Sequence, residues 1–169
     1  MFKDQVIWIT GASSGIGAAF ARQLAKQGAL LILSGRNLNA LEEVASACGP
    51  DRCLVLPFET TDYAALPALA EQAWGWRNGV DCLINNAGIS QRSLAIETQF
   101  PVYQKVVDVD LLAPIDHINH RPTKYRLHTP VVDVVRAYRI HADQRRIVEA
   151  RNRQGGGLID PGGLRIFDS

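Results

Sequence analysis

The chain has 169 residues, of which 47% are hydrophobic, and its formal net charge is +1. A chain of this length holds one domain with a sizeable core, and this composition is typical of globular proteins rather than disordered ones. No apolar stretch approaches the roughly 18 residues of a membrane helix, and no cationic leader precedes an apolar run. The sequence therefore predicts neither a membrane span nor secretion, and we expect a cytoplasmic protein.

Charge is distributed unevenly along the chain. Residues 1–116 hold 8 Lys/Arg and 12 Asp/Glu, whereas residues 117–169 hold 10 and 5. All four histidines lie in the second segment. By composition the chain is two pieces, an acidic one followed by a basic one.

The cysteines predict reduced thiols. Their number is odd, and Cys48, Cys53 and Cys82 show no C-x-x-C spacing and stand in apolar surroundings. This pattern favours free thiols over disulfides, and we expect no metal site.

Apolar runs and helical stripes alternate along the first piece. Short apolar runs predict strands buried on both faces of a parallel sheet, at residues 6–9, 30–33, 53–56 and 80–85. Apolar residues at helical spacing predict helices between and after them, at residues 18–25, 38–45, 66–74 and 101–112. Because strands that alternate with helices imply right-handed crossovers, the sequence predicts an α/β fold.

A glycine-rich turn joins the first predicted strand to the first predicted helix. Its sequence is Thr10-Gly11-Ala12-Ser13-Ser14-Gly15-Ile16-Gly17. Such a turn points backbone N–H groups and the positive end of the helix dipole at one spot, which suits a phosphate. Gly11 permits the turn, Gly15 lets a ligand approach the backbone, and Gly17 lets the helix pack close to the strand. The alternative is an ordinary corner that needs small residues, but three glycines at this spacing favour a nucleotide site.

The spacing Gly-x-x-x-Gly-x-Gly, with Thr10 before it and Asn85-Asn86-Ala87-Gly88 further on, resembles the short-chain dehydrogenase/reductase family. The resemblance runs from about residue 6 to about residue 115. It implies a doubly wound Rossmann-type parallel sheet with strand order 3-2-1-4, a nicotinamide dinucleotide and alcohol–carbonyl oxidoreductase chemistry. We accordingly expect an NAD(P)-binding domain over residues 1–115, with a truncated sheet, and a basic, partly helical or disordered tail over residues 116–169.

The resemblance also implies the cofactor contacts. Arg36 closes the second predicted strand, where an acidic residue suits a ribose 2′-hydroxyl and an arginine suits a 2′-phosphate, so it favours NADP over NAD. The alternative for Arg36 is a solvated arginine at a strand end, and Asn85 to Gly88 could instead stabilise the end of the fourth strand. Glu59 stands where the family usually has an Asp near the adenine. The candidate cofactor-binding residues are Gly11, Ser13, Ser14, Gly15, Ile16, Gly17, Arg36, Glu59, Asn85, Ala87 and Gly88.

The family's catalytic residues are absent from the sequence. Family members use a serine after a fifth strand and a Tyr-x-x-x-Lys pair, in which the lysine favours the phenolate of the tyrosine. The residues four positions after the tyrosines Tyr63, Tyr103, Tyr125 and Tyr138 are Pro67, Val107, Thr129 and Ala142. Asp110 also replaces an Asn of the family; it accepts hydrogen bonds but donates none. We therefore assign no catalytic residue and expect an impaired oxidoreductase, whose substrate, if it is active, is a small carbonyl or alcohol.

The basic tail leaves two further hypotheses open. Residues 131–153 predict one arginine-rich helix, with Thr129 as cap and Pro130 in its first turn. The tail could contact nucleic acid phosphates, although it lacks a recognised fold and interleaved aromatics. Otherwise the chain is a non-catalytic nucleotide-binding protein, or a truncated or frameshifted product. An unpaired apolar edge at residues 80–84 predicts self-association.

Overall fold

The structure is a computed structural model that describes residues 2–91, 93–120 and 131–133. All of these belong to one compact unit, Met1–Val135. The predicted division of the chain into domains over 1–115 and 116–169 stays a prediction, because most of the second segment lies outside the described residues.

Five parallel strands form one sheet with the order β3-β2-β1-β4-β5. The strands are β1 (Val6–Thr10), β2 (Leu30–Gly35), β3 (Cys53–Pro57), β4 (Cys82–Asn85) and β5 (Val131–Asp133). The α-helices are α1 (Gly15–Lys26), α2 (Leu38–Cys48), α3 (Leu66–Gly75), α4 (Phe100–Val107) and α5 (Ala113–Asn119). Shorter helical turns are η1 (Pro50–Arg52), η2 (Ala95–Glu97) and the π-helical η3 (Asp108–Leu112). The predicted α/β fold with a doubly wound parallel sheet and strand order 3-2-1-4 is confirmed, and a fifth strand extends it.

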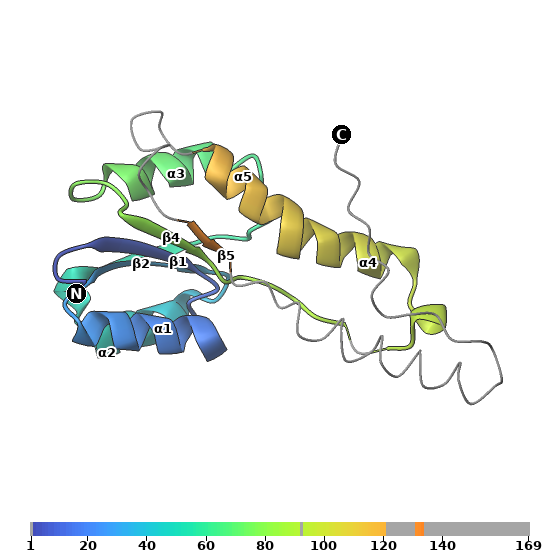
Figure 1. Ribbon diagram of the computed structural model, residues 1–169, viewed down its shortest axis with the longest axis horizontal. Helices are drawn as coiled ribbons and strands as arrows, with labels where there is room; N and C mark the ends of the chain where they lie inside the picture. Colours follow the sequence, from blue (N-terminus) through green and yellow to red (C-terminus); the bar gives the residue numbers. More distant parts are fainter. Residues whose placement is uncertain (1, 92, 121–130, 134–169) are drawn as a thin grey trace, which may run out of the picture. The chain divides into compact units, whose positions relative to one another are not determined.

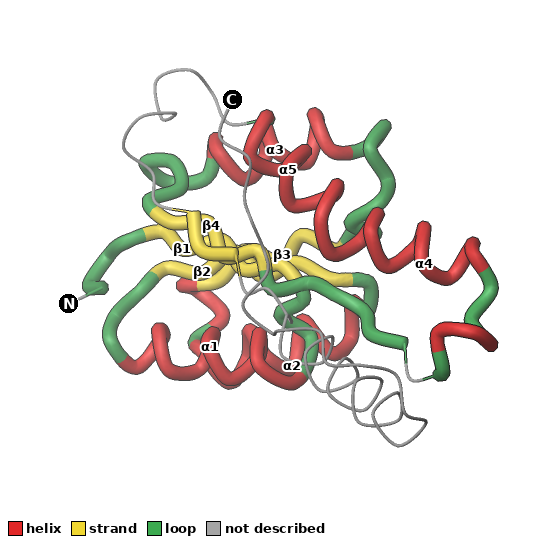
Figure 2. The backbone as a smooth tube through the Cα atoms, turned by 45° about the vertical axis from the view of Figure 1, so that its right-hand side comes forward, coloured by secondary structure: helices red, strands yellow, loops and turns green. Residues whose placement is uncertain are grey.

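Two apolar layers enclose the sheet. Figures 1 and 2 show α1 and α2 on one face and α3 and α5 on the other. Alternate side chains of β1 supply both layers: Ile7 and Ile9 pack with α1 and α2, whereas Val6 and Trp8 pack with α3. Because β1 is the central strand and is buried along its whole length, it needs an apolar side chain at every position except the last.

The segment predicted as a helix from residue 131 is a strand where the structure describes it. Val131 and Val132 pair in parallel with Leu83 and Ile84 of β4. The helix prediction is therefore wrong for residues 131–133; Thr129, Pro130 and residues 134–153 lie outside the described residues. Two β-branched residues fit a pleated strand, and the unpaired backbone groups of β4 supply its partner.

The helix predicted over residues 101–112 is longer and irregular. Helix α4 is followed without a break by η3 and then by α5, so the helical segment ends at Asn119 and extends past residue 115, the expected end of the domain. Pro114, in the first turn of α5, cannot donate the hydrogen bond that an α-helix needs at that position. The helix instead takes a π-helical turn, in which each N–H donates to the carbonyl five residues earlier, as Ala113 N–H does to Asp108. None of the helices that the structure describes is long and apolar enough to cross a membrane.

Candidate nucleotide-binding site

The glycine-rich turn takes the conformation that its composition predicts. Gly11 and Gly15 have φ of +65° and +54°, a region that favours glycine. A Cβ added at Gly17 would collide with the Gly11 carbonyl oxygen and the Asn86 side chain, so only glycine fits where α1 passes the turn. Nothing lies within 4 Å of a Cβ added at Gly15, which leaves space for a ligand beside the backbone.

Buried hydrogen bonds connect this turn to the segment after β4. The Thr10 hydroxyl oxygen accepts from the backbone N–H groups of Asn86 and Ala87, each at 3.0 Å. The Asn86 side-chain amide donates to the carbonyls of Thr10 at 3.0 Å and Gly11 at 3.2 Å. Buried polar groups need such partners, so these bonds hold the two loops together at the carboxyl ends of the strands, which we call the carboxyl edge of the sheet. The Thr10–Asn86 connection is a side-chain contact that sequence reasoning missed.

Parallel strands bring most of the predicted residues to this edge. The glycine-rich turn follows β1, Arg36 follows β2, and Asn85 closes β4. A Cβ added at Gly35 would stand 3.4 Å from the Ser13 hydroxyl oxygen, so the turn lies against the end of β2. Ser14 and Gly15 are exposed, and the Ile16 side chain is half-exposed. Edges of this kind, beside the first strand of a doubly wound sheet, are where such folds bind nucleotides.

Arg36 and Glu59 meet at the same edge. Arg36 Nη1 lies 3.5 Å from Glu59 Oε2, and both side chains are largely solvent-accessible. Arg36 also lines an open cavity of about 470 Å³, whose other lining residues come from the loop after β4 and from α4: Ile89, Ser90, Gln91, Pro101, Val102, Lys105 and Val106.

Asn85 has a neighbour that the sequence did not reveal. Its side-chain oxygen lies 3.3 Å from His117 Nδ1, and the imidazole stacks on Trp8 and meets Phe58 edge-on. Burial lowers the pKa of His117 to about 4, with a smaller opposing effect from Asp116 and a lowering effect from His120. The ring is therefore neutral near pH 7, and its Nδ1–H tautomer donates to Asn85. Asn85 thus stabilises the end of β4, one of the two roles that the sequence left open for it.

Two aspartates of η3 accept hydrogen bonds from segments that are distant in sequence. Asp110 Oδ1 accepts from the backbone N–H of Ile89 at 2.8 Å, which matches its acceptor-only chemistry. Asp108 accepts a hydrogen bond from the Tyr63 hydroxyl. Partial burial, and then this contact with Asp108, raise the pKa of Tyr63 to about 12, so its phenol stays protonated at neutral pH.

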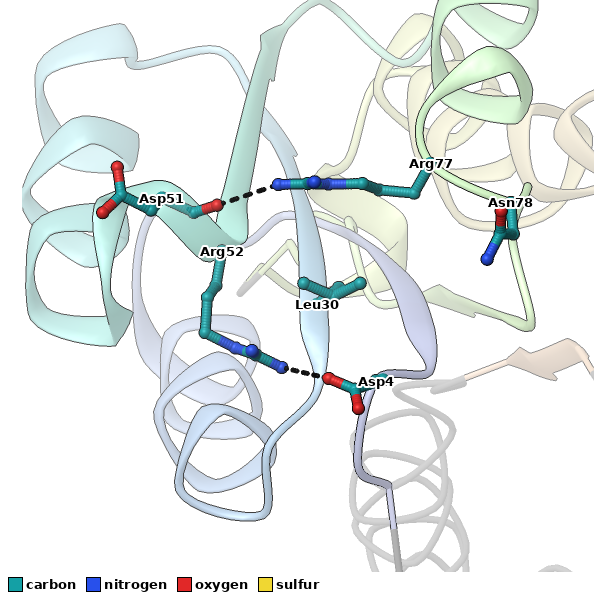
Figure 3. A pocket seen from close by; sticks show the side chains of 6 residues that line it. All are labelled: Asp4, Leu30, Asp51, Arg52, Arg77 and Asn78. Carbon is teal, nitrogen blue, oxygen red and sulfur yellow. Dashed lines mark hydrogen bonds and ion pairs between the residues drawn. The ribbon is translucent and has the colours of Figure 1, made fainter.

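A second cavity, of about 600 Å³, lies at the opposite end of the sheet and contains none of the predicted site residues. Figure 3 shows its two arginines reaching toward neighbouring turns. Arg52 Nη2 donates to Asp4 Oδ1 at 3.1 Å and to the Gly28 carbonyl at 2.5 Å. Arg77 Nη2 donates to the Asp51 carbonyl at 3.1 Å. These bonds join the turns before β1, β2 and β3, so the arginines have a structural role.

The three cysteines are free thiols and are only partly buried. Burial raises the pKa of all three thiols, and that of Cys53 to about 11, so they stay protonated at neutral pH. No cluster of three metal-ligating side chains occurs in the part of the chain that the structure describes. The arginine-rich segment considered for nucleic acid binding lies outside that part.

Known proteins share this sequence pattern. The profile of the short chain dehydrogenase family matches residues 5–121. The human dehydrogenase/reductase SDR family member 7 is 39% identical over 118 residues, which cover 66% of this chain and 35% of the relative. The bovine family member 7B is 34% identical over 121 residues, covering 67% of this chain and 37% of the relative. The chain therefore matches about a third of the length of these relatives.

Solved structures share the fold. A short-chain dehydrogenase from Streptomyces avermitilis superposes with a TM-score of 0.68 at 28% identity, covering 73% of this chain and 44% of that one. The L-sorbose reductase from Gluconobacter frateurii, solved with NADPH and L-sorbose, superposes with a TM-score of 0.66 at 28% identity, covering 70% and 46%. With the family profile matched over most of the described residues, the chain belongs to the short-chain dehydrogenase/reductase family of oxidoreductases.

Proposed function

We propose that this chain binds NADP(H) in preference to NAD(H) at the edge formed by the glycine-rich turn, Arg36 and the segment after β4. The observation that carries the preference is Arg36. It occupies the position after β2 where an acidic residue would favour NAD, and its side chain is largely exposed. A guanidinium suits a ribose 2′-phosphate, whereas an acidic residue suits the 2′-hydroxyl of NAD.

The geometry of the turn supports a bound pyrophosphate. Gly15 leaves open space beside the backbone, and the side chain of Ser14, at the N-cap of α1, makes no capping hydrogen bond among the described residues. Backbone N–H groups in this first helical turn are suitable donors to phosphate oxygens. We assign Gly11, Ser13, Ser14, Gly15, Ile16 and Gly17 to the pyrophosphate, Glu59 to the adenine, and Asn85, Ala87 and Gly88 to the ribose beside the nicotinamide.

We further propose that the chain binds the cofactor without efficient turnover. The bound nicotinamide supplies or accepts a hydride, and the protein must move a proton at the substrate oxygen. None of the 169 residues forms the Tyr-x-x-x-Lys pair that does this in the family. The substrate class implied by the family is a small carbonyl or alcohol.

Cofactor titration tests the proposal. NADPH and NADH are titrated separately into the 169-residue protein and into Arg36→Ala, with nicotinamide fluorescence as the signal. We expect wild type to bind NADPH about tenfold or more tightly than NADH, because a charge-assisted contact to the 2′-phosphate contributes about 1.5–3 kcal/mol. Arg36→Ala should lose most of this preference, whereas Arg22→Ala, which removes an exposed arginine of α1, should retain it. An unchanged preference in Arg36→Ala would contradict the assignment.

A further inference from the structure

The cavity beside Arg36 is lined by a second cation, Lys105. Arg36 reaches it from the end of β2, and Lys105 reaches it from the last turn of α4. The loop after β4 contributes Ile89, Ser90 and Gln91 to the same wall. Figure 2 shows α4 following that loop, outside the sheet. The two cations therefore come from elements far apart in sequence but share one volume of about 470 Å³.

The charges in this region make Arg36 alone a weak anion receptor. Glu59 lies 3.5 Å from its guanidinium, so this pair has no net charge. Lys105 is exposed and forms no ion pair with any of the described residues. Apart from Arg36 and Lys105, the described side chains on the cavity wall are uncharged, so among the described residues Lys105 is the source of its excess positive charge.

We propose that Lys105 is a second specificity-determining cation, which contacts the 2′-phosphate of NADP(H) together with Arg36. This inference rests on the proposed function, because it needs the adenosine end of the nucleotide to enter the cavity beside Arg36. A ribose 2′-phosphate carries nearly two negative charges at neutral pH, and the Arg36–Glu59 pair offers it no net charge. Lys105 supplies the missing charge, while Val102 and Val106 flank it on α4 with apolar surface.

The test compares Lys105→Met with wild type in titrations of NADPH, NADH and 2′,5′-ADP at low salt. Methionine keeps the length of the side chain and removes the charge. We expect NADPH and 2′,5′-ADP to bind about 5- to 20-fold more weakly, with NADH unchanged, since one charged phosphate contact is lost. Lys105→Arg should restore NADPH binding. Lys26→Met, which removes an exposed lysine in the last turn of α1, should change neither affinity.

The outcomes separate this inference from the proposed function. If wild type prefers NADPH and Arg36→Ala loses the preference while Lys105→Met keeps it, the role of Lys105 is overturned and the proposed function stands. If Lys105→Met weakens NADPH and NADH equally, Lys105 does not contact the 2′-phosphate, and the inference is again overturned. If wild type shows no preference, both fail. The effect of Lys105→Met should also shrink as salt is raised, because exposed charges are screened.

Discussion

At the scale of single residues, His117 is the most unusual group in the core. It is 2% exposed, and among the described residues its Nε2 has no hydrogen-bond partner. Trp8 stacks on its ring and Phe58 meets it edge-on, and within the described residues its polar contact is to Asn85 at the end of β4. A buried imidazole is tolerated only in its neutral form, because burial disfavours the charge.

This burial predicts acid sensitivity with a definite sign. The pKa of His117 is about 4 in the folded protein and near 6.5 when unfolded, so between these values the unfolded chain binds more protons. Stability is complete above about pH 6.5 and is lost as the pH falls toward 4. We expect wild type to lose about 2 kcal/mol between pH 7.5 and pH 5 through this residue. Urea unfolding at several pH values measures the loss.

His117→Phe is the informative variant, since an aromatic ring without a titrating group fills the same place. Its stability should fall much less steeply over that pH range than that of wild type. His120→Gln, which removes a partly exposed histidine of the next turn, should keep the wild-type slope. Equal slopes for wild type and His117→Phe would refute the assignment of the acid sensitivity to His117.

At the scale of elements, β5 changes how the sheet ends. The sequence predicts an open apolar edge on β4 and, from it, self-association; in the structure Val131 and Val132 pair with that edge. Self-association itself stays a prediction. Within the described residues, β5 is now the edge strand on this side of the sheet, and it is only three residues long. Short edge strands offer little backbone for pairing with another molecule.

Disrupting β5 should expose the edge of β4 again. Proline at position 132 lacks the backbone N–H and fixes φ, so Val132→Pro should weaken the pairing with Ile84 by about 1 kcal/mol or more. We expect concentration-dependent self-association, measured by size-exclusion chromatography with light scattering. Val132→Thr, which keeps the branched β-carbon and the N–H, is the control. Identical elution of the two variants at every concentration would show that β5 does not protect this edge.

The elements differ in how much the sequence reveals of them. Four strands and the helices between them are predictable because buried runs and helical stripes alternate regularly, and the glycine-rich turn because its dihedral angles demand glycine. β5 is not predictable from the sequence, because Thr129-Pro130 before two valines also fits the start of a helix. Pairing with the neighbouring β4 decides between a helix and a strand there. The contacts of Thr10 with Asn86 and of Asn85 with His117 join side chains distant in sequence, which no local pattern encodes.

At the scale of the whole molecule, we expect cofactor binding without catalysis. We expect the 169-residue chain to bind NADPH but to show no reduction above background with aldehydes, ketones or quinones. General acid–base help contributes about 10²–10⁴ in rate, and the pair that provides it in the family is missing. NADPH consumption measures turnover, and NADPH titration of the same preparation is the control for a folded site.

Tyrosine variants decide what any activity would mean. Turnover that survives in both Tyr125→Phe and Tyr138→Phe would show a mechanism other than the family's. Turnover that either replacement abolishes would show that the second piece of the chain supplies a proton donor, and the proposal of impaired catalysis would be wrong.

The hydrogen bonds from Asn86 to Thr10 bridge 76 positions of the chain. The proposed nucleotide pocket is therefore complete only when β4 is docked beside β1. A nucleotide that recognises this pocket lowers the free energy of the docked state alone, by an amount that grows with the logarithm of its concentration. The cellular dinucleotide pool would then act as a folding ligand for this chain, rescuing β4 docking and protecting the protein from degradation whether or not any hydride is transferred.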